Sequence, residues 1–325
     1  MRNTGLVAAT AVLMAMFFPL SAPAADAERD YPVKPIRMVV PFPTGFASDF
    51  LARVVSLKLS ELYGKQIIVD NRPGGGGVIG SVLVAKATPD GYTLSTVGVP
   101  HLVNVLITAE PQYRPLEDFT PIGQIASLPN FVLAGGSFNT LQELIAAAKQ
   151  KPGQLNFASG GVGSQSHIAG ELFKLAAGID TVHVPFRSLG DAATEMVSGR
   201  VQYYVIPITA GLPLLKDGRL KALAVTVDKR LDLLPEVPTM GEAGLPGFRI
   251  DGWFGVVGPA GMPRALVTRL SADINTVLSQ ADTRERFLRQ GADPVYTAPA
   301  AFEKMMKEEL LRYRDVVRAA GIKAQ

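Results

Sequence analysis

Short apolar runs and amphipathic stretches alternate along most of the chain. Nearly continuous apolar runs at residues 36–42 and 93–99 predict buried strands. Between such runs, apolar residues recur at spacings of three and four, which predicts helices with one buried face, as at residues 51–62. A further helix is expected at residues 165–177, ended by Gly178. This alternation predicts an α/β fold with mainly parallel sheets flanked by helices.

The first 25 residues have a different pattern. Arg2 supplies a positive charge, residues 6–20 are almost entirely apolar, and small residues follow at 21–25. This order is typical of a secretory signal peptide. An uncleaved anchor is the alternative, but a membrane helix needs about 20 apolar residues, and this run is shorter. We therefore expect residues 1–25 to be a signal peptide cleaved near Ala24 to Ala27, and the mature chain to be periplasmic.

Composition and charge exclude several classes of protein. The chain contains no cysteine, which excludes disulfides, thiolate zinc sites and a lipid anchor. Loss of Arg2 with the signal peptide would reduce the net charge from +3 to about +2. Because basic and acidic residues are interspersed along the chain, we expect no nucleic-acid partner.

The length of the mature chain, about 300 residues, predicts two domains. Pro129 and Gly135 follow one apolar segment, and a glycine- and proline-rich stretch at residues 244–247 precedes another. These positions are candidate crossings of a hinge. We expect residues 26–125 with 250–325 to form lobe I and residues 126–249 to form an inserted lobe II, with the ligand cleft between them.

The first candidate binding loop joins the strand at 36–42 to the helix that follows. In open α/β sheets, ligands bind beyond the carboxyl ends of the strands, and a helix N-terminus there favours an anion. Asp49 has an alternative role as a helix-start residue that pairs with Arg53. The candidate residues in this loop are Thr44, Gly45, Phe46, Ala47, Ser48 and Asp49.

The second candidate loop repeats this arrangement in the other half of the chain. Its candidate residues are Ser159, Gly163, Ser164 and His167. Ser164 also fits an ordinary N-cap, and a lone histidine in a first helical turn is more often structural than catalytic. Two such helix starts facing a cleft would hold a carboxylate. Arg187, which ends a later strand, is the candidate cationic contact, with a surface or interlobe salt bridge as the alternative.

Motifs for catalysis and for cofactors are incomplete. Residues 75–80 match G-x-G-x-x-G, but the next strand does not end in the acidic residue that a dinucleotide site requires. The chain has no nucleophile elbow and no P-loop, and its three histidines lack the spacing of a metal site. We therefore expect no catalytic residue, no cofactor and no metal.

A resemblance to a known family rests on many short segments in a specific order. The chain resembles the Bug family, the substrate-binding proteins of tripartite tricarboxylate transporters, over essentially its whole mature length. The segments include V-D-N-R-P-G-G-G-G at 69–77 and N-F-A-S-G-G-V-G-S at 156–164, followed by His167. The others are residues 31–37, 89–94, 183–187, 223–226, 234–239, 242–247 and 253–255.

The resemblance implies a two-lobed Venus-flytrap fold whose loops at 44–48 and 159–164 hold a carboxylate, partly through water. Two departures from the family bear on the ligand. Phe46 stands where the family commonly has a glycine, and Gln202 where it often has an aspartate. Tyr203 and Tyr204 follow, and strand alternation allows at most one of them, taken here as Tyr204, to approach the cleft. These departures favour an aromatic or otherwise apolar carboxylate over citrate or aspartate.

Together these patterns and the resemblance predict a monomeric periplasmic receptor for a small organic carboxylate, which partners integral-membrane permease subunits and is not an enzyme. The alternatives are a ligand-sensing module of a membrane signalling protein and, with less support, a hydrolase or dehydrogenase.

Overall fold

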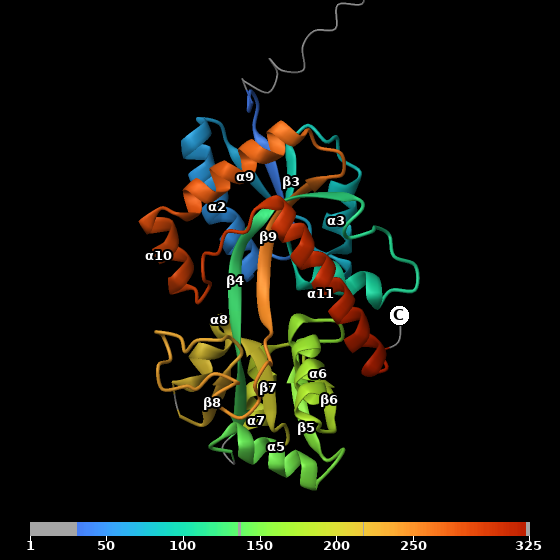
Figure 1. The fold of residues 1–325 in the computed structure, drawn as a ribbon, viewed down its shortest axis with the longest axis vertical. Helices are drawn as coiled ribbons and strands as arrows, with labels where there is room; N and C mark the ends of the chain where they lie inside the picture. The colour runs from blue at the N-terminus through green and yellow to red at the C-terminus, as the bar shows by residue number, and fades with distance from the viewer. Residues whose placement is uncertain (1–30, 136–137, 217, 323–325) are drawn as a thin grey trace, which may run out of the picture. The chain divides into compact units, whose positions relative to one another are not determined.

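Two groups of strands share one long strand, β4, in the computed structural model of the chain (Figure 1). The structure describes residues 31–135, 138–216 and 218–322, so the predicted signal peptide lies outside the described residues. Residues 32–325 form one compact unit, to which every helix and strand of the described chain belongs. No helix in the described part of the chain combines the length and the apolar character that a membrane crossing requires.

The first strand group has the order β2-β1-β3-β9-β4. The β1 strand pairs in parallel with β2 and β3, whereas β9 runs antiparallel to both β3 and β4. The bounds of these strands are β1 (Ile36–Val40), β2 (Ile67–Asn71), β3 (Thr93–Gly98), β4 (Phe119–Gly135) and β9 (Asp251–Pro259).

The second strand group begins where β4 changes partners. From Phe119 to Pro129 this strand pairs with β9, and from Asn130 onward it pairs antiparallel with β7 and β8. The β5 strand then pairs in parallel with β7 and β6. The bounds are β5 (Leu155–Ser159), β6 (Thr181–Pro185), β7 (Tyr203–Pro207) and β8 (Leu220–Val225). The sheet is therefore mixed: the α/β class is confirmed, but antiparallel pairing surrounds β4 because β4 and β9 carry the chain between the two groups.

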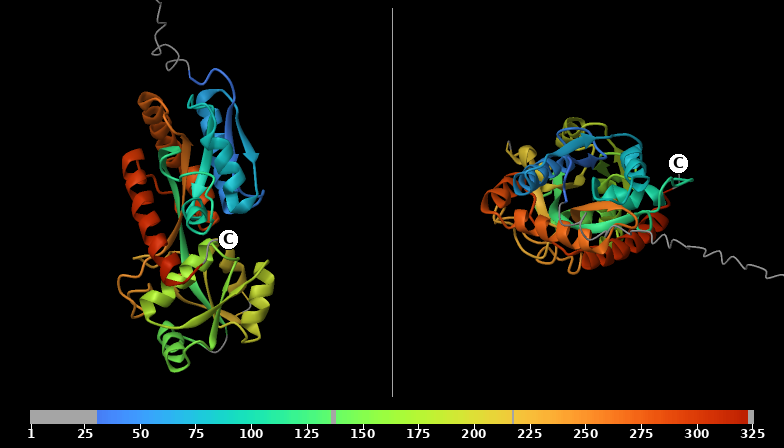
Figure 2. Two further views of the ribbon diagram at one scale, coloured as in Figure 1. Left: turned by 90° about the vertical axis from the view of Figure 1, so that its right-hand side faces the viewer. Right: turned by 90° about the horizontal axis from the view of Figure 1, so that it is seen from above.

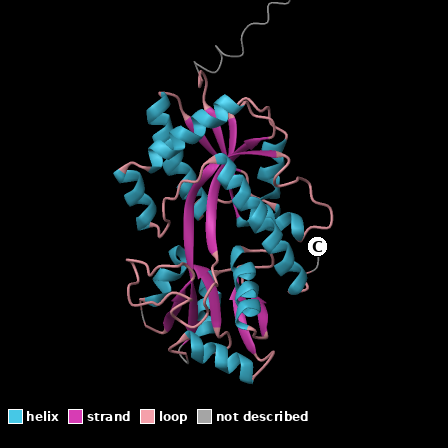
Figure 3. Cartoon of the chain, in the orientation of Figure 1, coloured by secondary structure: helices cyan, strands magenta, loops and turns pink. Residues whose placement is uncertain are grey.

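Helices flank both strand groups, as Figures 2 and 3 show. In the first group, α2 packs against β1 and β2, α3 packs against β3, and α9 and α11 pack against β4. In the second group, α6 packs against β5 and β7, and α7 and α8 contact β4. The α-helices are α2 (Ala47–Tyr63), α3 (Val78–Ala85), α4 (Val99–Val103), α5 (Leu141–Gln150), α6 (Gln165–Ala177), α7 (Leu189–Val197), α8 (Ile208–Gly211), α9 (Arg264–Leu278), α10 (Ala281–Arg289) and α11 (Pro299–Ala319). Short 3-10 helices are η1 (Gly75–Gly77), η2 (Asn104–Leu106) and η3 (Leu212–Leu215).

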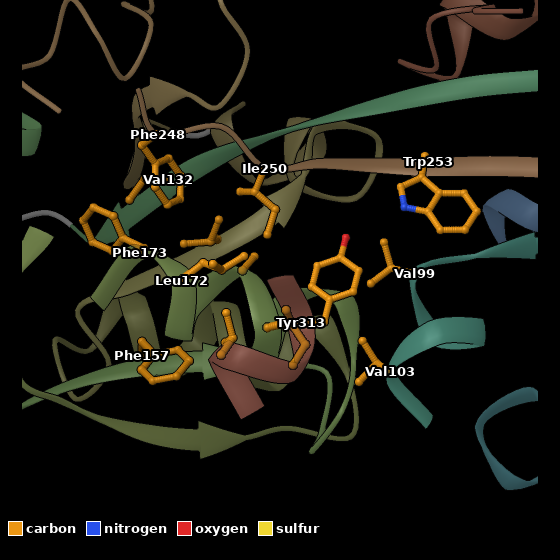
Figure 4. Packing of buried hydrophobic residues seen from close by; sticks show 14 of the residues in the cluster. Val99, Val103, Val132, Phe157, Leu172, Phe173, Phe248, Ile250, Trp253 and Tyr313 are labelled. Carbon is orange, nitrogen blue, oxygen red and sulfur yellow. The ribbon is translucent and has the colours of Figure 1, made fainter. Parts of the chain in front are cut away.

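One apolar cluster contains residues from both strand groups. Figure 4 shows fully buried Tyr313 of α11 with Val99 and Val103 on one side and Leu172 of α6 on the other. Burying apolar surface contributes about 25 cal/mol per Å², so this shared core stabilises the placement of α6 against the first strand group.

Local chemistry explains several helix ends. The α6 helix begins and ends where predicted, with the Ser164 hydroxyl accepting from the His167 amide and Gly178 in the left-handed conformation, at φ 60°. Gly64 ends α2 in the same way. The strand predicted at 93–99 ends one residue earlier, because Val99 begins α4 with a proline in its first turn.

Candidate functional site

The first candidate loop joins β1 to α2. Gly45 has φ +89°, which favours glycine, and the Asp49 carboxylate accepts a hydrogen bond from its amide at 3.0 Å. Phe46 is the N-cap residue of α2, and no side chain caps this helix start. The first-turn amides of Ala47 and Ser48 therefore receive no side-chain acceptor from the cap residue. Thr44 precedes this turn and is exposed.

The Asp49 carboxylate holds the first loop together. It is buried, and it accepts from Arg53 Nε at 3.1 Å and from Asn71 Nδ2 at 3.0 Å. Desolvation alone would raise the pKa of Asp49, but hydrogen bonds from Arg53, the Gly45 amide and Asn71 lower that pKa below its usual value. The predicted pairing with Arg53 is confirmed. A ligand-binding role for Asp49 stays a prediction, and its oxygens are already engaged within the loop.

The second candidate loop joins β5 to α6 and is held by its own side chains. The Gly160 amide donates to Ser166 Oγ at 3.1 Å, and the Gly161 amide donates to Ser159 Oγ at 3.0 Å. The Gly163 amide donates to Nδ1 of His167 at 3.1 Å. This loop is therefore organised before any ligand binds.

Hydroxyl groups from β7 and α6 meet beside this loop. Ser166 Oγ lies 3.2 Å from Ser164 Oγ and 3.5 Å from the Tyr204 hydroxyl. Tyr203 points to the opposite face of the strand, where its hydroxyl lies 2.7 Å from Thr181 Oγ1. Of the two tyrosines, Tyr204 is thus the one beside the loop. Ser166 was missed by sequence reasoning, although its place in the first turn of a helix after glycines was a usable signal.

Two stacked imidazoles lie behind the loop. The rings of His167 and His183 are 3.9 Å apart, and Ser159 Oγ lies 2.5 Å from His183 Nε2. Burial, followed by the charges of the nearby His183 and Lys174, lowers the pKa of His167 to about 4. Burial, followed by the charge of Lys174, also lowers the pKa of His183 to about 4. Both rings are therefore neutral at pH 7, and the accepting Nδ1 atom of His167 agrees with that state.

A short helical segment connects the two candidate loops with a third glycine-rich loop, which lies between β2 and α3. At the third loop, a Cβ added to Gly77 would lie 3.4 Å from the ring of Phe42, which belongs to the first loop. Asn104 Nδ2 donates to the Gly76 carbonyl at 2.7 Å. Three residues later, the side chain of Ile107 packs directly against Gly163, where an added Cβ would overlap it. This link was not predicted, because the local pattern around Asn104 indicates neither a helix face nor a turn.

The first and second loops share no direct hydrogen bond or ring contact among the described residues. Arg187 is exposed, and within the described chain it forms no ion pair, so its role stays a prediction. No group of three or more histidine, aspartate or glutamate side chains in the described ranges could hold a metal ion.

A pocket of about 460 Å³ lies elsewhere, between β6 and α7. None of the predicted site residues lines it, and the ion pair between Arg200 and Glu195 fills part of its polar wall. Its lining residues are Asn156, Val184, Phe186, Asp191, Thr194, Glu195, Arg200 and Val201.

The fold is similar to that of solved periplasmic receptors. A protein of R. palustris solved with adipate is 34% identical, with a TM-score of 0.78 over 91% of this chain and 100% of the other. The periplasmic binding protein BugD is 30% identical, with a TM-score of 0.74 over 91% of this chain and 100% of the other. MatC from Rhodopseudomonas palustris, with bound malate, is 33% identical, with a TM-score of 0.74 over 88% and 100%. The fold is therefore that of the periplasmic solute-binding proteins.

Sequence comparison narrows this class. Residues 51–322 match the tripartite tricarboxylate transporter family receptor, TctC. A UPF0065 protein of Pseudomonas sp. (strain P51) is 39% identical over 88% of this chain and 86% of its own length. BugT of Bordetella pertussis is 34% identical over 96% of this chain and 97% of its own length. The chain belongs to the TctC receptor family of tripartite tricarboxylate transporters, which confirms the resemblance.

Proposed function

We propose that this chain is a periplasmic receptor that binds a small organic carboxylate and delivers it to the permease subunits of a tripartite tricarboxylate transporter. Under this proposal, residues 1–25 are a cleaved signal peptide, and the mature chain is a monomer that catalyses nothing and uses no cofactor or metal. Two lobes close on the ligand: lobe I contains residues 26–125 with 250–325, and lobe II contains residues 126–249. The ligand binds the closed form more tightly than the open form, and this difference in affinity drives the closure.

The uncapped N-terminus of α2 is the observation that carries the proposal. Phe46 provides no side-chain acceptor, so the amides of Ala47 and Ser48 and the positive end of the helix dipole favour an anionic ligand. The similar proteins solved with adipate and malate support a carboxylate as that anion.

The second loop would hold the ligand through hydroxyl groups. Ser159, Ser164 and Tyr204 lie on or beside this loop, and Gly163 keeps its backbone close to Ile107. Hydroxyls orient a carboxylate without adding charge, so a neutral site of this kind binds one anionic group without a buried ion pair.

Isothermal titration of the mature protein, refolded to remove any carried ligand, tests the proposal. The panel contains malate, adipate and benzoate together with the corresponding uncharged amides. We expect at least one acid to bind and its amide not to bind, because the amide has the same shape without the negative charge. If no acid binds, or if acids and amides bind equally, the proposal is wrong.

Adjacent tyrosines offer a matched pair of variants. Tyr204→Phe removes the hydroxyl beside Ser166, and we expect about a five- to tenfold loss of affinity, the value of one hydrogen bond. Tyr203→Phe removes the hydroxyl that meets Thr181 on the opposite face, so it should change stability and leave affinity unchanged. Equal effects of the two variants on affinity would exclude Tyr204 from the site.

A further inference from the structure

Each of the three glycine-rich loops exposes one large apolar side chain. Phe46 in the first loop is 57% exposed, Ile79 beside the third loop is 57% exposed, and Val162 in the second loop is 44% exposed. Exposed apolar side chains that gather in one region mark binding surfaces more often than singly scattered ones do. Here they coincide with the loops that carry the candidate anion contacts.

Contacts along the chain connect the three loops that carry these side chains. Phe42 of the first loop packs near Gly77, and Asn104 donates to Gly76 of the third loop. Ile107 then packs against Gly163, the residue directly after Val162. At the third loop, Ile79 lies over Gly74, where an added Cβ would overlap its side chain. The exposed apolar groups therefore belong to a connected set of loops.

The polar groups of the same loops carry little positive charge. The Arg53 guanidinium is bound to Asp49, with 2.9 Å between Nη2 and Oδ1, so its charge is already balanced. The amide of Gly163 donates to a ring nitrogen of His167, which must therefore be unprotonated. Backbone amides and hydroxyls can hold one carboxylate. A second or third carboxylate would lose its hydration without a buried cation to replace it, and the predicted cationic contact, Arg187, is exposed to water.

We propose that the ligand has one carboxylate on an apolar body, either an aliphatic chain or an aromatic ring, and that Phe46, Ile79 and Val162 contact that body. This inference rests on the proposed carboxylate-receptor function and names the substrate class of the same site. The loop amides hold the charged end, and the three apolar side chains set the preference for the body attached to it.

A matched series of ligands tests the preference by titration calorimetry. Butyrate and hexanoate differ by two methylene groups, and adipate is a six-carbon chain with a carboxylate at each end. At about fourfold per buried methylene, hexanoate should bind about fifteenfold more tightly than butyrate. It should also bind more tightly than adipate, and benzoate more tightly than malate. Tighter binding of malate or adipate than of hexanoate and benzoate overturns the inference and leaves the carboxylate receptor intact. Binding by no carboxylate overturns both.

Variants on one helix supply the control. Phe46→Ala should weaken the binding of hexanoate or benzoate by about tenfold or more, because it removes a large apolar contact. Leu57→Ala, on the same helix, removes a side chain that is 46% exposed and lies beyond the loop, and it should leave affinity unchanged. Equal affinities of the two variants for hexanoate and benzoate would refute the role of Phe46.

Discussion

The Gln165 side chain, which follows the second glycine-rich loop, contacts both long strands of the fold, β4 and β9. Its Nε2 atom donates to Asn130 Oδ1 of β4 at 3.3 Å. On β9, Gly252 leaves room for the same carboxamide, because an added Cβ there would overlap it. Asn130 is fully buried, and its Nδ2 atom donates to the Ile250 carbonyl at 2.9 Å. A change at Gly252 should therefore be transmitted to the loop through Gln165.

The methyl group added by Gly252→Ala would meet the Gln165 carboxamide first and displace it. Oδ1 of buried Asn130 then loses its hydrogen bond from Gln165, which costs about 1–3 kcal/mol. In the absence of Gln165, alanine in a strand would instead be about 0.5–1 kcal/mol more stable than glycine. The gain from alanine offsets part of this loss, so the expected net destabilisation in the native background is up to about 2.5 kcal/mol, with the opposite sign if the contact is absent.

A double-mutant cycle measures this coupling directly. The free energy of unfolding is determined by denaturant titration for the native chain, for Gly252→Ala, for Gln165→Ala and for the double variant. We expect Gln165→Ala to lose stability, and we expect Gly252→Ala to stabilise the protein by about 0.5–1 kcal/mol once Gln165 is alanine. The lost hydrogen bond then corresponds to a coupling energy of about 1–3 kcal/mol. Additive effects within about 0.5 kcal/mol would refute the reasoning.

Two further predictions concern the packing and the protonation of the same region. Gly170→Ala should destabilise the protein by about 1–3 kcal/mol, because the new methyl group would overlap the buried ring of Phe157. Gly190→Ala, on the exposed face of α7, should stabilise the protein by about 0.5–1 kcal/mol. Calorimetry that gives both changes the same sign would contradict this. The pKa values of His167 and His183, lowered to about 4, make the folded state bind fewer protons than the unfolded chain, so stability is complete above about pH 6.5 and decreases as the pH falls toward 4. Thermal unfolding from pH 7 to 4 measures this decrease, and replacement of His183 by glutamine should reduce it; an unchanged slope would exclude that imidazole.

Local chemistry made much of the fold predictable from the sequence. A few neighbouring residues predict the N-cap at Ser164 and the terminating Gly178, and the structure has both in place. Alternation along β7 likewise separates Tyr203 from Tyr204, because successive strand side chains point to opposite faces. These features depend on backbone geometry within one element, which is why the sequence predicts them.

The long strand β4 was harder to predict because its neighbours lie far away in the sequence. Pro121, Gly123 and Pro129 interrupt its apolar pattern and suggest a loop, yet the strand continues from Phe119 to Gly135. Register shifts with β9 between Pro121 and Gly123 and between Gln124 and Ala126 accommodate these interruptions. Residues more than 100 positions away therefore determine this strand, and no local pattern contains them.

The site shows the same division between local and distant information. Each glycine-rich loop can be predicted from its own residues, since glycines, hydroxyls and a helix start are adjacent in the sequence. The arrangement of the loops depends on Asn104 and Ile107, which belong to none of them and which pack against Gly76 and Gly163. Because these two contacts join segments about 28 and 56 residues apart, the composition of the binding surface follows from the sequence, whereas its geometry is a property of the packed fold.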